Sequence, residues 1–545
     1  MVDYHRLEVD ARGSLGHPYK GASELMIALF ERDPDTAVLA ARGRLVWLAP
    51  IAPVVRRWIS IPPEVERALE VSREGERRDW SQRVAHGLVD FVLDALDGPS
   101  ERIGIIVRNL GAEPLDREFF RTLRRRADPD RLTLDLIDGP DPPATPGEDV
   151  ETLAAQARRY MNLACYDAAL YWAQLAEAAL AGRRDGPLRA RIAHERVFAL
   201  LLLERFEEVE ALCSTWLHQE TDPAILIDAG YAQAILHARF HAPDRRDYRA
   251  ARGCVEAALA AAQSLPPSDA RAINIAFLQN TLALVEFREG RPDLAHRLLT
   301  DAIAYLAREA PGSFAREGTI LLRNRARVHR AQQRHEAALA DLHRLHELEP
   351  SHPEAWFDRA LIHQKAGNYS AAVADYDHAI FWAPPQIETL HNRAQCLHAL
   401  GRHRDAWRAC GRVLEIAPDH LGALTDRACL SQALGERETL VRDVEHGLCC
   451  APQDPRLLCL AAIVAFVEGR LDAALDLFDA ALARQPDLPD AWANRALIHF
   501  RRGDTEKALA DVDHALALRD DAATRRNRQR IVNRIKALAS SSTSA

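Results

Sequence analysis

The sequence lacks the features of a membrane-spanning protein or of a secreted, disulfide-bonded protein. Its most apolar stretches, 198–203 and 457–467, are far shorter than the roughly 20 residues that cross a bilayer. The first residues, MVDYHRLEVDARG, contain no apolar run of signal-peptide type. The nine cysteines include no Cys-x-x-Cys pair, and isolated cysteines are common buried residues in reducing compartments. We therefore expect a cytoplasmic protein with no membrane partner.

Recognisable catalytic motifs are also missing. The sequence contains no Gly-x-Ser-x-Gly, no His-Glu-x-x-His and no Gly-x-x-x-x-Gly-Lys-Ser/Thr phosphate loop. The 22 histidines are interpreted as packing and surface residues, because His343 and His346 stand one turn apart without a third metal ligand. The adjacent Cys449 and Cys450 point to different faces of one helix, which argues against a redox pair. We predict no catalytic residue, no metal and no cofactor.

Bulk composition limits the kinds of partner. The chain has 545 residues, too many for one hydrophobic core, and 48% of them are hydrophobic. The net charge of −9 has the wrong sign for a general nucleic-acid binder. The composition therefore favours several packed regions and a protein or peptide partner rather than a nucleic acid.

The most regular feature of the chain is a proline that recurs every 34 residues. A proline cannot continue a helix, so a proline at a fixed interval ends one structural unit in each interval. This interval predicts a stack of helix pairs in the C-terminal half, each burying its apolar face on its neighbours. The prolines are Pro350, Pro384, Pro418, Pro452 and Pro486.

Six units of 34 residues, starting at positions 319, 353, 387, 421, 455 and 489, share a pattern. Position 4 is bulky, positions 8 and 20 are mostly alanine, and position 15 is glycine in five units. The stretch AWFDRALIHQKAGNYSAAVADYDHAIFWAP is a near-consensus example, and the pattern resembles the tetratricopeptide repeat. That resemblance implies a mainly α fold, a tetratricopeptide-repeat superhelix of the α-solenoid type.

The rest of the chain is divided by composition and by weaker copies of the repeat. Before the repeats we expect a small α/β domain (1–138) and a proline-rich linker (139–148). Divergent repeats are expected over 149–318, followed by six regular repeats over 319–522. A basic helix that caps the stack is predicted at 523–539, before a disordered tail at 540–545.

The α/β prediction depends on residues 81–138. Helices are expected at 81–97 and 115–126, and the apolar run RIGIIVRNL at 102–110 is typical of a buried strand, followed by a second strand at 131–138. Strand, helix and strand at this spacing predict a small parallel sheet.

The same segment also resembles the middle of a signal-transduction NTPase. In that family the strand delivers an acidic residue that holds magnesium, whereas this chain has Val107-Arg108-Asn109-Leu110 there. The phosphate loop is missing, and Gly13-Ser14-Leu15-Gly16 has neither its lysine nor its spacing. The resemblance implies a nucleotidase-derived domain that has lost hydrolysis. An α/β domain without this ancestry is the alternative.

Position 6 of each repeat suggests where a ligand binds. In five of the six units it is Asn or Asp, while Leu460 interrupts the series. A row of amides can exchange hydrogen bonds with an extended peptide backbone, although Asn or Asp is also common at this position in the family. The predicted peptide-binding residues are Asn324, Asp358, Asn392, Asp426, Asn494, Arg323, Arg327 and Lys365.

Position 7 is arginine in five units, and we expect these side chains to pair with acids of the next unit. Taken together, the sequence favours a non-enzymatic scaffold that binds a protein or an extended peptide. Two alternatives remain: a signalling regulator with a catalytically inactive nucleotide sensor, and a subunit that presents substrates in a peptide-modifying enzyme system.

Overall fold

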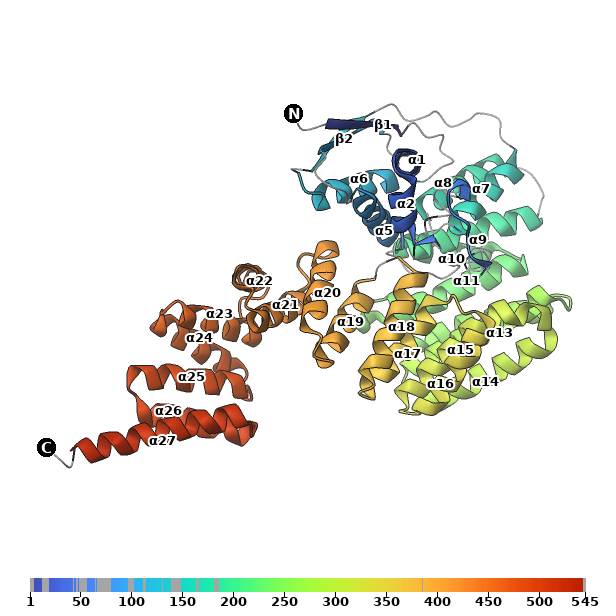
Figure 1. The fold of residues 1–545 in the computed structure, drawn as a ribbon. Coiled ribbons are helices and arrows are strands. Elements are labelled where there is room, and N and C mark those ends of the chain that lie inside the picture. Colours follow the sequence, from blue (N-terminus) through green and yellow to red (C-terminus); the bar gives the residue numbers. More distant parts are fainter. Residues whose placement is uncertain are drawn as a thin grey trace. The chain divides into compact units, whose positions relative to one another are not determined.

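In the computed structural model the chain forms two compact units, residues 1–386 and 387–545 (Figure 1). The predicted linker, 139–148, and the last three residues of the predicted tail lie outside the described part of the chain. The structure describes residues 4–11, 19–42, 44–45, 48, 56–63, 65, 80–96, 102–110, 114–129, 131–138, 149–162, 166–180, 186–384 and 386–542.

A parallel sheet of three strands, in the order β1-β2-β3, forms the N-terminal α/β region. The strands are β1 (Tyr4–Asp10), β2 (Arg102–Leu110) and β3 (Leu132–Asp138). The central strand pairs with both neighbours, and its side chains Ile105 and Val107 are completely buried. The small α/β fold, including the strands at 102–110 and 131–138, is confirmed. The strand β1 was missed, because its mixed polar sequence carries little strand signal.

Four described helices accompany the sheet: α1 (Lys20–Arg32), α2 (Pro34–Ala41), α5 (Trp80–Ala95) and α6 (Pro114–Arg126). The helix α6 has Asp116 in its first turn and three arginines in its last turn, and charges at these ends interact favourably with the helix dipole. The Asp116 carboxylate is buried and accepts hydrogen bonds from the backbone N–H groups of Gly21 (2.8 Å) and Ala22 (3.0 Å). A side chain of α6 thus caps the start of α1.

Gly21 is required by this close packing. A Cβ at this residue would lie 2.8 Å from Phe120 Cε2 and 2.9 Å from Ala11 Cβ. We expect Gly21→Ala to lower the free energy of unfolding by about 1–3 kcal/mol, because a packed core accommodates an extra methyl group poorly. Hydrogen exchange of α1 and α6 would measure the change. Gly253→Ala is the matched control, since a Cβ there meets nothing within 4 Å; an equal effect of both substitutions would contradict the prediction.

Pairs of helices follow the sheet through the rest of residues 1–386. Those in the predicted divergent region are α7 (Val150–Asn162), α8 (Tyr166–Leu180), α9 (Gly186–Leu202), α10 (Phe206–Gln219), α11 (Pro223–Ile235), α12 (Tyr248–Ser264), α13 (Asp269–Arg288) and α14 (Pro292–Glu309). A π-helical turn, Leu236–Phe240, extends α11 before the short 3₁₀ turn Pro243–Arg245. Next come α15 (Pro311–Ala331), α16 (His335–Leu348), α17 (Pro353–Lys365) and α18 (Tyr369–Trp382).

One cluster of buried side chains includes members of both the α/β region and the first repeats. Phe30 of α1, Val107 of β2, Tyr160 of α7 and Ile192 of α9 belong to it, together with Trp382 at the end of α18. The α/β region and the first repeats therefore share a hydrophobic core.

The second unit repeats one helix pair at the predicted interval (Figure 1). Each first helix begins at the predicted start of a 34-residue unit, and the last helix extends to Ser542, so 540–542 are helical where a disordered tail was expected. The helices are α19 (Ile387–Ala399), α20 (His403–Ile416), α21 (Leu421–Leu434), α22 (Arg437–Cys450), α23 (Pro455–Val467), α24 (Leu471–Arg484), α25 (Pro489–Arg502), α26 (Thr505–Leu518) and α27 (Ala522–Ser542).

Position 15 adopts the left-handed conformation in all six regular units. Five of these residues are glycines with φ between 75° and 89°, and Gln333 takes the same place in the first unit with φ of 60°. A glycine has no Cβ and adopts this conformation without strain, which explains its recurrence after the first helix. The helix bounds and this turn confirm the predicted solenoid fold for the regular repeats.

In two of the units, the tryptophan at position 4 donates a hydrogen bond to the proline at the end of the preceding unit. Trp356 Nε1 donates to the Pro350 carbonyl at 2.8 Å, and Trp492 Nε1 donates to the Pro486 carbonyl at 2.7 Å. The guanidinium of the position 7 arginine lies over each indole, 4.5 Å from the ring centre. The recurrent proline therefore ends one unit and accepts a hydrogen bond from the next.

Within the described residues, none of the helices combines the length and the apolar character needed to cross a membrane.

Candidate functional site

Within each compact unit, the first helices of successive repeats contact one another. Direct contacts join α13 to α15, α15 to α17, α19 to α21, α21 to α23 and α23 to α25. Side-chain contacts between these helices involve positions 2, 5, 6, 9, 12 and 13 of the units. We call the surface formed by these positions the inner face. It carries all eight predicted peptide-binding residues.

In residues 1–386, four of the five predicted binding residues already bond to other side chains of this unit. Asn324 Nδ2 donates to Oδ1 of Asn280 on α13 at 2.8 Å. Arg327 Nε donates to the Asp358 carboxylate at 2.8 Å, and Asp358 is only 3% exposed. Arg323 forms an ion pair with Glu354 on α17. These side chains connect successive first helices, so their hydrogen-bonding groups are already used within the chain. Lys365, in contrast, is exposed at the end of α17.

Asp426 is engaged in the same way in the second unit. Its carboxylate lies 3.0 Å from His391 Nε2 and accepts a hydrogen bond from Gln395 Nε2 at 3.3 Å. Arg456 on α23 completes an ion pair at 3.2 Å. Burial alone would raise the pKa of Asp426, but the hydrogen bonds from His391 and Gln395 and the charge of Arg456 lower it. Asp426 is therefore a charged link between α19, α21 and α23.

Asn392 and Asn494 differ from the other position 6 residues. Both are half-buried, and neither side-chain amide has a hydrogen-bond partner among the described residues. An amide of this kind can donate one hydrogen bond and accept another at the same time. These two residues are the members of the predicted ladder whose hydrogen-bonding groups remain available to a ligand.

An apolar surface on α23 lies between these asparagines in the chain. Ile463 and Phe466 are half-buried, and the side chain of Val467 is 66% exposed. The Arg501 guanidinium of α25 lies over the Phe466 ring, 4.4 Å from its centre. The inner face of residues 387–545 thus combines apolar side chains with a bordering positive charge.

The position 7 arginines have a structural role, but their partners differ from those predicted. Each of four arginines binds the carboxylate located 16 residues later on the second helix of the same unit, not an acid of the next unit. Arg427, for example, donates to both oxygens of Asp443 at 2.6 Å, and Asp443 is 1% exposed. The other pairs are Arg325–Asp341, Arg359–Asp375 and Arg495–Asp511.

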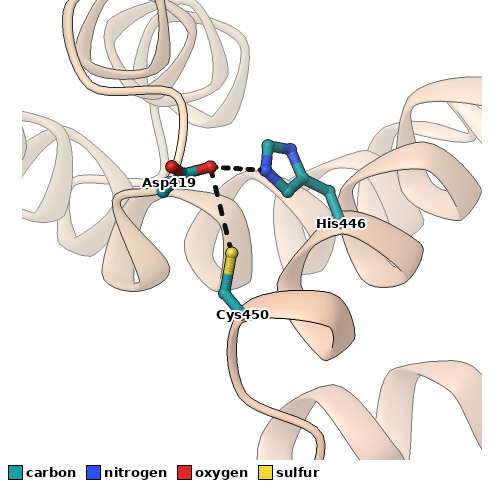
Figure 2. Close-up of side chains that lie close together, drawn as sticks. All are labelled: Asp419, His446 and Cys450. Atoms are coloured by element: carbon teal, nitrogen blue, oxygen red, sulfur yellow. Dashed lines mark hydrogen bonds and ion pairs between the residues drawn. The ribbon is translucent and has the colours of Figure 1, made fainter.

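A cluster of possible metal ligands, missed in the sequence, lies at the end of α22. His446 and Cys450 stand one turn apart on this helix, and Asp419 approaches them from the turn that follows α20 (Figure 2). His446 Nε2 lies 2.7 Å from Asp419 Oδ1, and Cys450 Sγ lies 4.0 Å from the same oxygen. Asp419 comes from a separate element, so the pair on the helix alone does not reveal the cluster.

The start of α1, which follows β1 as the phosphate-binding helix follows its strand in an NTPase, is already capped. The buried Asp116 carboxylate occupies the N–H groups of Gly21 and Ala22, and burial raises its pKa to about 6 despite these hydrogen bonds. A helix N-terminus filled by the chain's own carboxylate disfavours a bound phosphate. The resemblance to an NTPase gains no support here, and residues 13–16 lie outside the described part of the chain.

Comparison with known proteins identifies the repeats. Tetratricopeptide repeat family models match residues 325–395 and 459–523, and neither match reaches the α/β region. The tetratricopeptide repeats predicted in these stretches are therefore confirmed. Among curated proteins, none matches the chain.

Solved structures give partial similarities. A tetratricopeptide repeat protein from Parabacteroides merdae ATCC 43184 is 20% identical, with 47% of this chain and 93% of that chain covered and a TM-score of 0.32. MamA from Desulfovibrio magneticus RS-1 is 16% identical over 30% of this chain and 94% of its own, with a TM-score of 0.28. A chain of the APC/C hetero-tetramer Cut9–Hcn1 is 11% identical over 70% and 90%, with a TM-score of 0.34.

Proposed function

We propose that this chain is a non-enzymatic scaffold that binds a protein partner through an extended peptide segment on the inner face of residues 387–545. One observation carries the proposal: Asn392 and Asn494 have available amides in the described structure, and an exposed apolar surface on α23 lies between them in sequence. The inner face of residues 1–386 is the weaker candidate, because Asn324, Arg327 and Asp358 already bond within the chain.

Each part of this surface matches a feature of an extended peptide. The two amides can exchange hydrogen bonds with backbone N–H and C=O groups, which every peptide offers. The half-buried Ile463 and Phe466 and the exposed Val467 offer contacts to apolar side chains. Arg456, whose side chain is 54% exposed, and Arg501 add positive charge nearby. We therefore expect a segment that carries both apolar and acidic residues.

The substrate-presenting alternative uses the same surface, with a peptide that is modified after it binds. The nucleotide-sensor alternative is less favoured, because Asp116 occupies the N–H groups at the start of α1. Neither alternative has an observation of its own in its favour.

Peptide selection with the full-length chain tests the proposal. We expect a displayed library of random peptides to enrich apolar and acidic segments, and Val467→Asp to weaken the selected peptides by at least about tenfold. The reason is that a carboxylate replaces an apolar contact of about 1.5–3 kcal/mol and repels acidic residues. Val467 is 66% exposed, so the substitution leaves the fold intact. Fluorescence anisotropy of labelled peptides measures the affinity.

Leu518→Asp is the matched control for this substitution. Leu518 is also exposed and apolar, at 42%, but it lies at the end of a second helix, α26, away from the inner face. Its replacement should leave peptide affinity unchanged, whereas Asn392→Ala and Asn494→Ala should reduce it. Equal effects of the two aspartates, or selection of no peptide at all, would overturn the proposal.

A further inference from the structure

We propose that Asp419, His446 and Cys450 form a binding site for a divalent ion of the Zn²⁺ class, with a fourth coordination position open to solvent. The site is independent of the proposed peptide-binding surface. It rests on the positions of three side chains from two elements of residues 387–545, the turn after α20 and the last turns of α22 (Figure 2).

The three possible ligand atoms lie close enough to surround one ion. Asp419 Oδ1 is 2.7 Å from His446 Nε2 and 4.0 Å from Cys450 Sγ, and all three atoms lie within 4.8 Å of one another. Tetrahedral zinc, with bonds of about 2.0–2.3 Å, places its ligand atoms roughly 3.5 Å apart. Small side-chain rotations within this arrangement reach that separation. His446 and Cys450 stand four residues apart on one helix, so the backbone already holds two of the ligands together.

The types of ligand select the class of ion. A thiolate, an imidazole and a carboxylate together suit zinc and other first-row transition metals, whereas magnesium and calcium prefer oxygen ligands alone. Three protein ligands leave one tetrahedral position for water. The side chains of Asp419 and His446 are 80% and 40% exposed, so this position faces solvent.

Histidines occupy the same repeat position as His446 in two other units, but their contacts differ from those of His446. His378 and His514 occupy the same repeat position as His446, and each packs on the position 4 tryptophan of its own unit with ring centres 4.3 Å apart. In the unit that starts at 421, position 4 is Leu424, which offers no indole. His446 faces Asp419 instead.

The third ligand is also specific to this unit. The positions equivalent to Cys450 are Trp382 and Leu518, neither of which can bind a metal. An ion pair between His446 and Asp419 accounts for their contact but gives no reason for a cysteine beside the same carboxylate oxygen. A shared cation stabilises a thiolate and a carboxylate at this distance, because it lies between two groups that repel each other when both are ionised.

Cobalt titration of the reduced full-length chain tests the site. Co²⁺ adopts the same tetrahedral coordination as zinc and reports bound thiolate by a charge-transfer band, with intense visible d–d bands. We expect both bands to appear at one equivalent of Co²⁺ and to disappear when Zn²⁺ is added. Cys450→Ser should abolish the charge-transfer band, and His446→Gln and Asp419→Asn should each weaken Co²⁺ binding by at least about tenfold, since even outer groups around a metal contribute that much.

Two matched substitutions separate this site from other thiols and imidazoles. Cys449→Ser removes the neighbouring exposed cysteine, and His514→Gln removes a histidine at the equivalent repeat position; both should leave the cobalt spectrum and affinity unchanged. Persistence of the charge-transfer band in Cys450→Ser would overturn the proposal, as would its loss in Cys449→Ser. So would the failure of Co²⁺ to bind the unaltered chain.

Discussion

Replacing Arg427 with alanine will lower the local free energy of unfolding of α21 and α22 by about 3–5 kcal/mol, because it leaves the Asp443 carboxylate buried without its cation. The Asp443 side chain is 2% exposed, and both of its oxygens accept hydrogen bonds from the Arg427 guanidinium. The more distant Arg442, at 3.9 Å and 69% exposed, is too well solvated to replace it. Hydrogen exchange of α21 and α22, measured by mass spectrometry in the full-length chain, gives this free energy.

Another unit of the chain shows which residue pair to use in a control for Arg427→Ala. In the next unit, Ala461 and Leu477 occupy the positions of Arg427 and Asp443. We expect Arg427→Ala combined with Asp443→Leu to recover most of the lost stability, since an apolar pair leaves no charge buried. A double variant as unstable as Arg427→Ala alone would mean that the cavity, rather than the unpaired carboxylate, causes the loss.

Repetition made much of the fold predictable. One residue such as Pro418 says little, but the same spacing over several copies fixes the ends of the helices, and the glycines at position 15 fix the turns between them. The arginine partners also follow from the repeat: four units have Arg at position 7 and Asp at position 23 and form the pair, whereas the unit that starts at 455 has Ala461 and Leu477 at these positions. The comparison between copies contains this rule, and a single unit does not.

Whether a side chain at position 6 is bonded depends on residues of the preceding unit. Asp358 and Asp426 are bonded because the preceding unit offers Arg327 to one and His391 and Gln395 to the other. The residues that precede Asn494 at those positions are apolar instead, namely Cys459 and Ile463. An asparagine beside apolar residues keeps its amide available, so the available positions follow from pairs of units and not from position 6 alone.

Non-repeating parts offered less information. The strand β1 lies about 90 residues before β2 in the chain, and its alternation of polar and apolar residues over Tyr4–Asp10 is short. The cluster of Asp419, His446 and Cys450 joins a turn to a helix that follows another helix. Such contacts depend on how the elements pack against one another. A periodic sequence pattern predicts them only once the geometry of the helices and strands is known.

Acid will destabilise α16 and α17 around His346, and His346→Phe will remove much of this effect. The imidazole is 9% exposed and packs on Trp356, with ring centres 4.0 Å apart. Burial lowers its pKa to about 3, and the positive charges of Arg359, His343 and His378 lower the pKa by smaller amounts. The Leu342 backbone carbonyl raises this pKa, but its effect is the smallest. The folded chain therefore holds His346 neutral at pH values where an unfolded histidine is charged.

The sign follows from proton binding. Between pH 6.5 and about 3 the unfolded state binds a proton at His346 that the folded state does not, so stability falls as the pH falls through this range. The slope is about 1.4 kcal/mol per pH unit, or about 2 kcal/mol by pH 5.

Phenylalanine keeps an aromatic ring against Trp356 and cannot bind a proton. Hydrogen exchange of α16 and α17 at pH 7.5 and pH 5 should show a stability difference between variant and parent that grows toward pH 5. His218→Phe is the control, because His218 is exposed on α10 and lies outside the contact between His346 and Trp356. A difference between His346→Phe and its parent that stayed constant with pH would show that His346 accepts its proton without leaving its place against the indole.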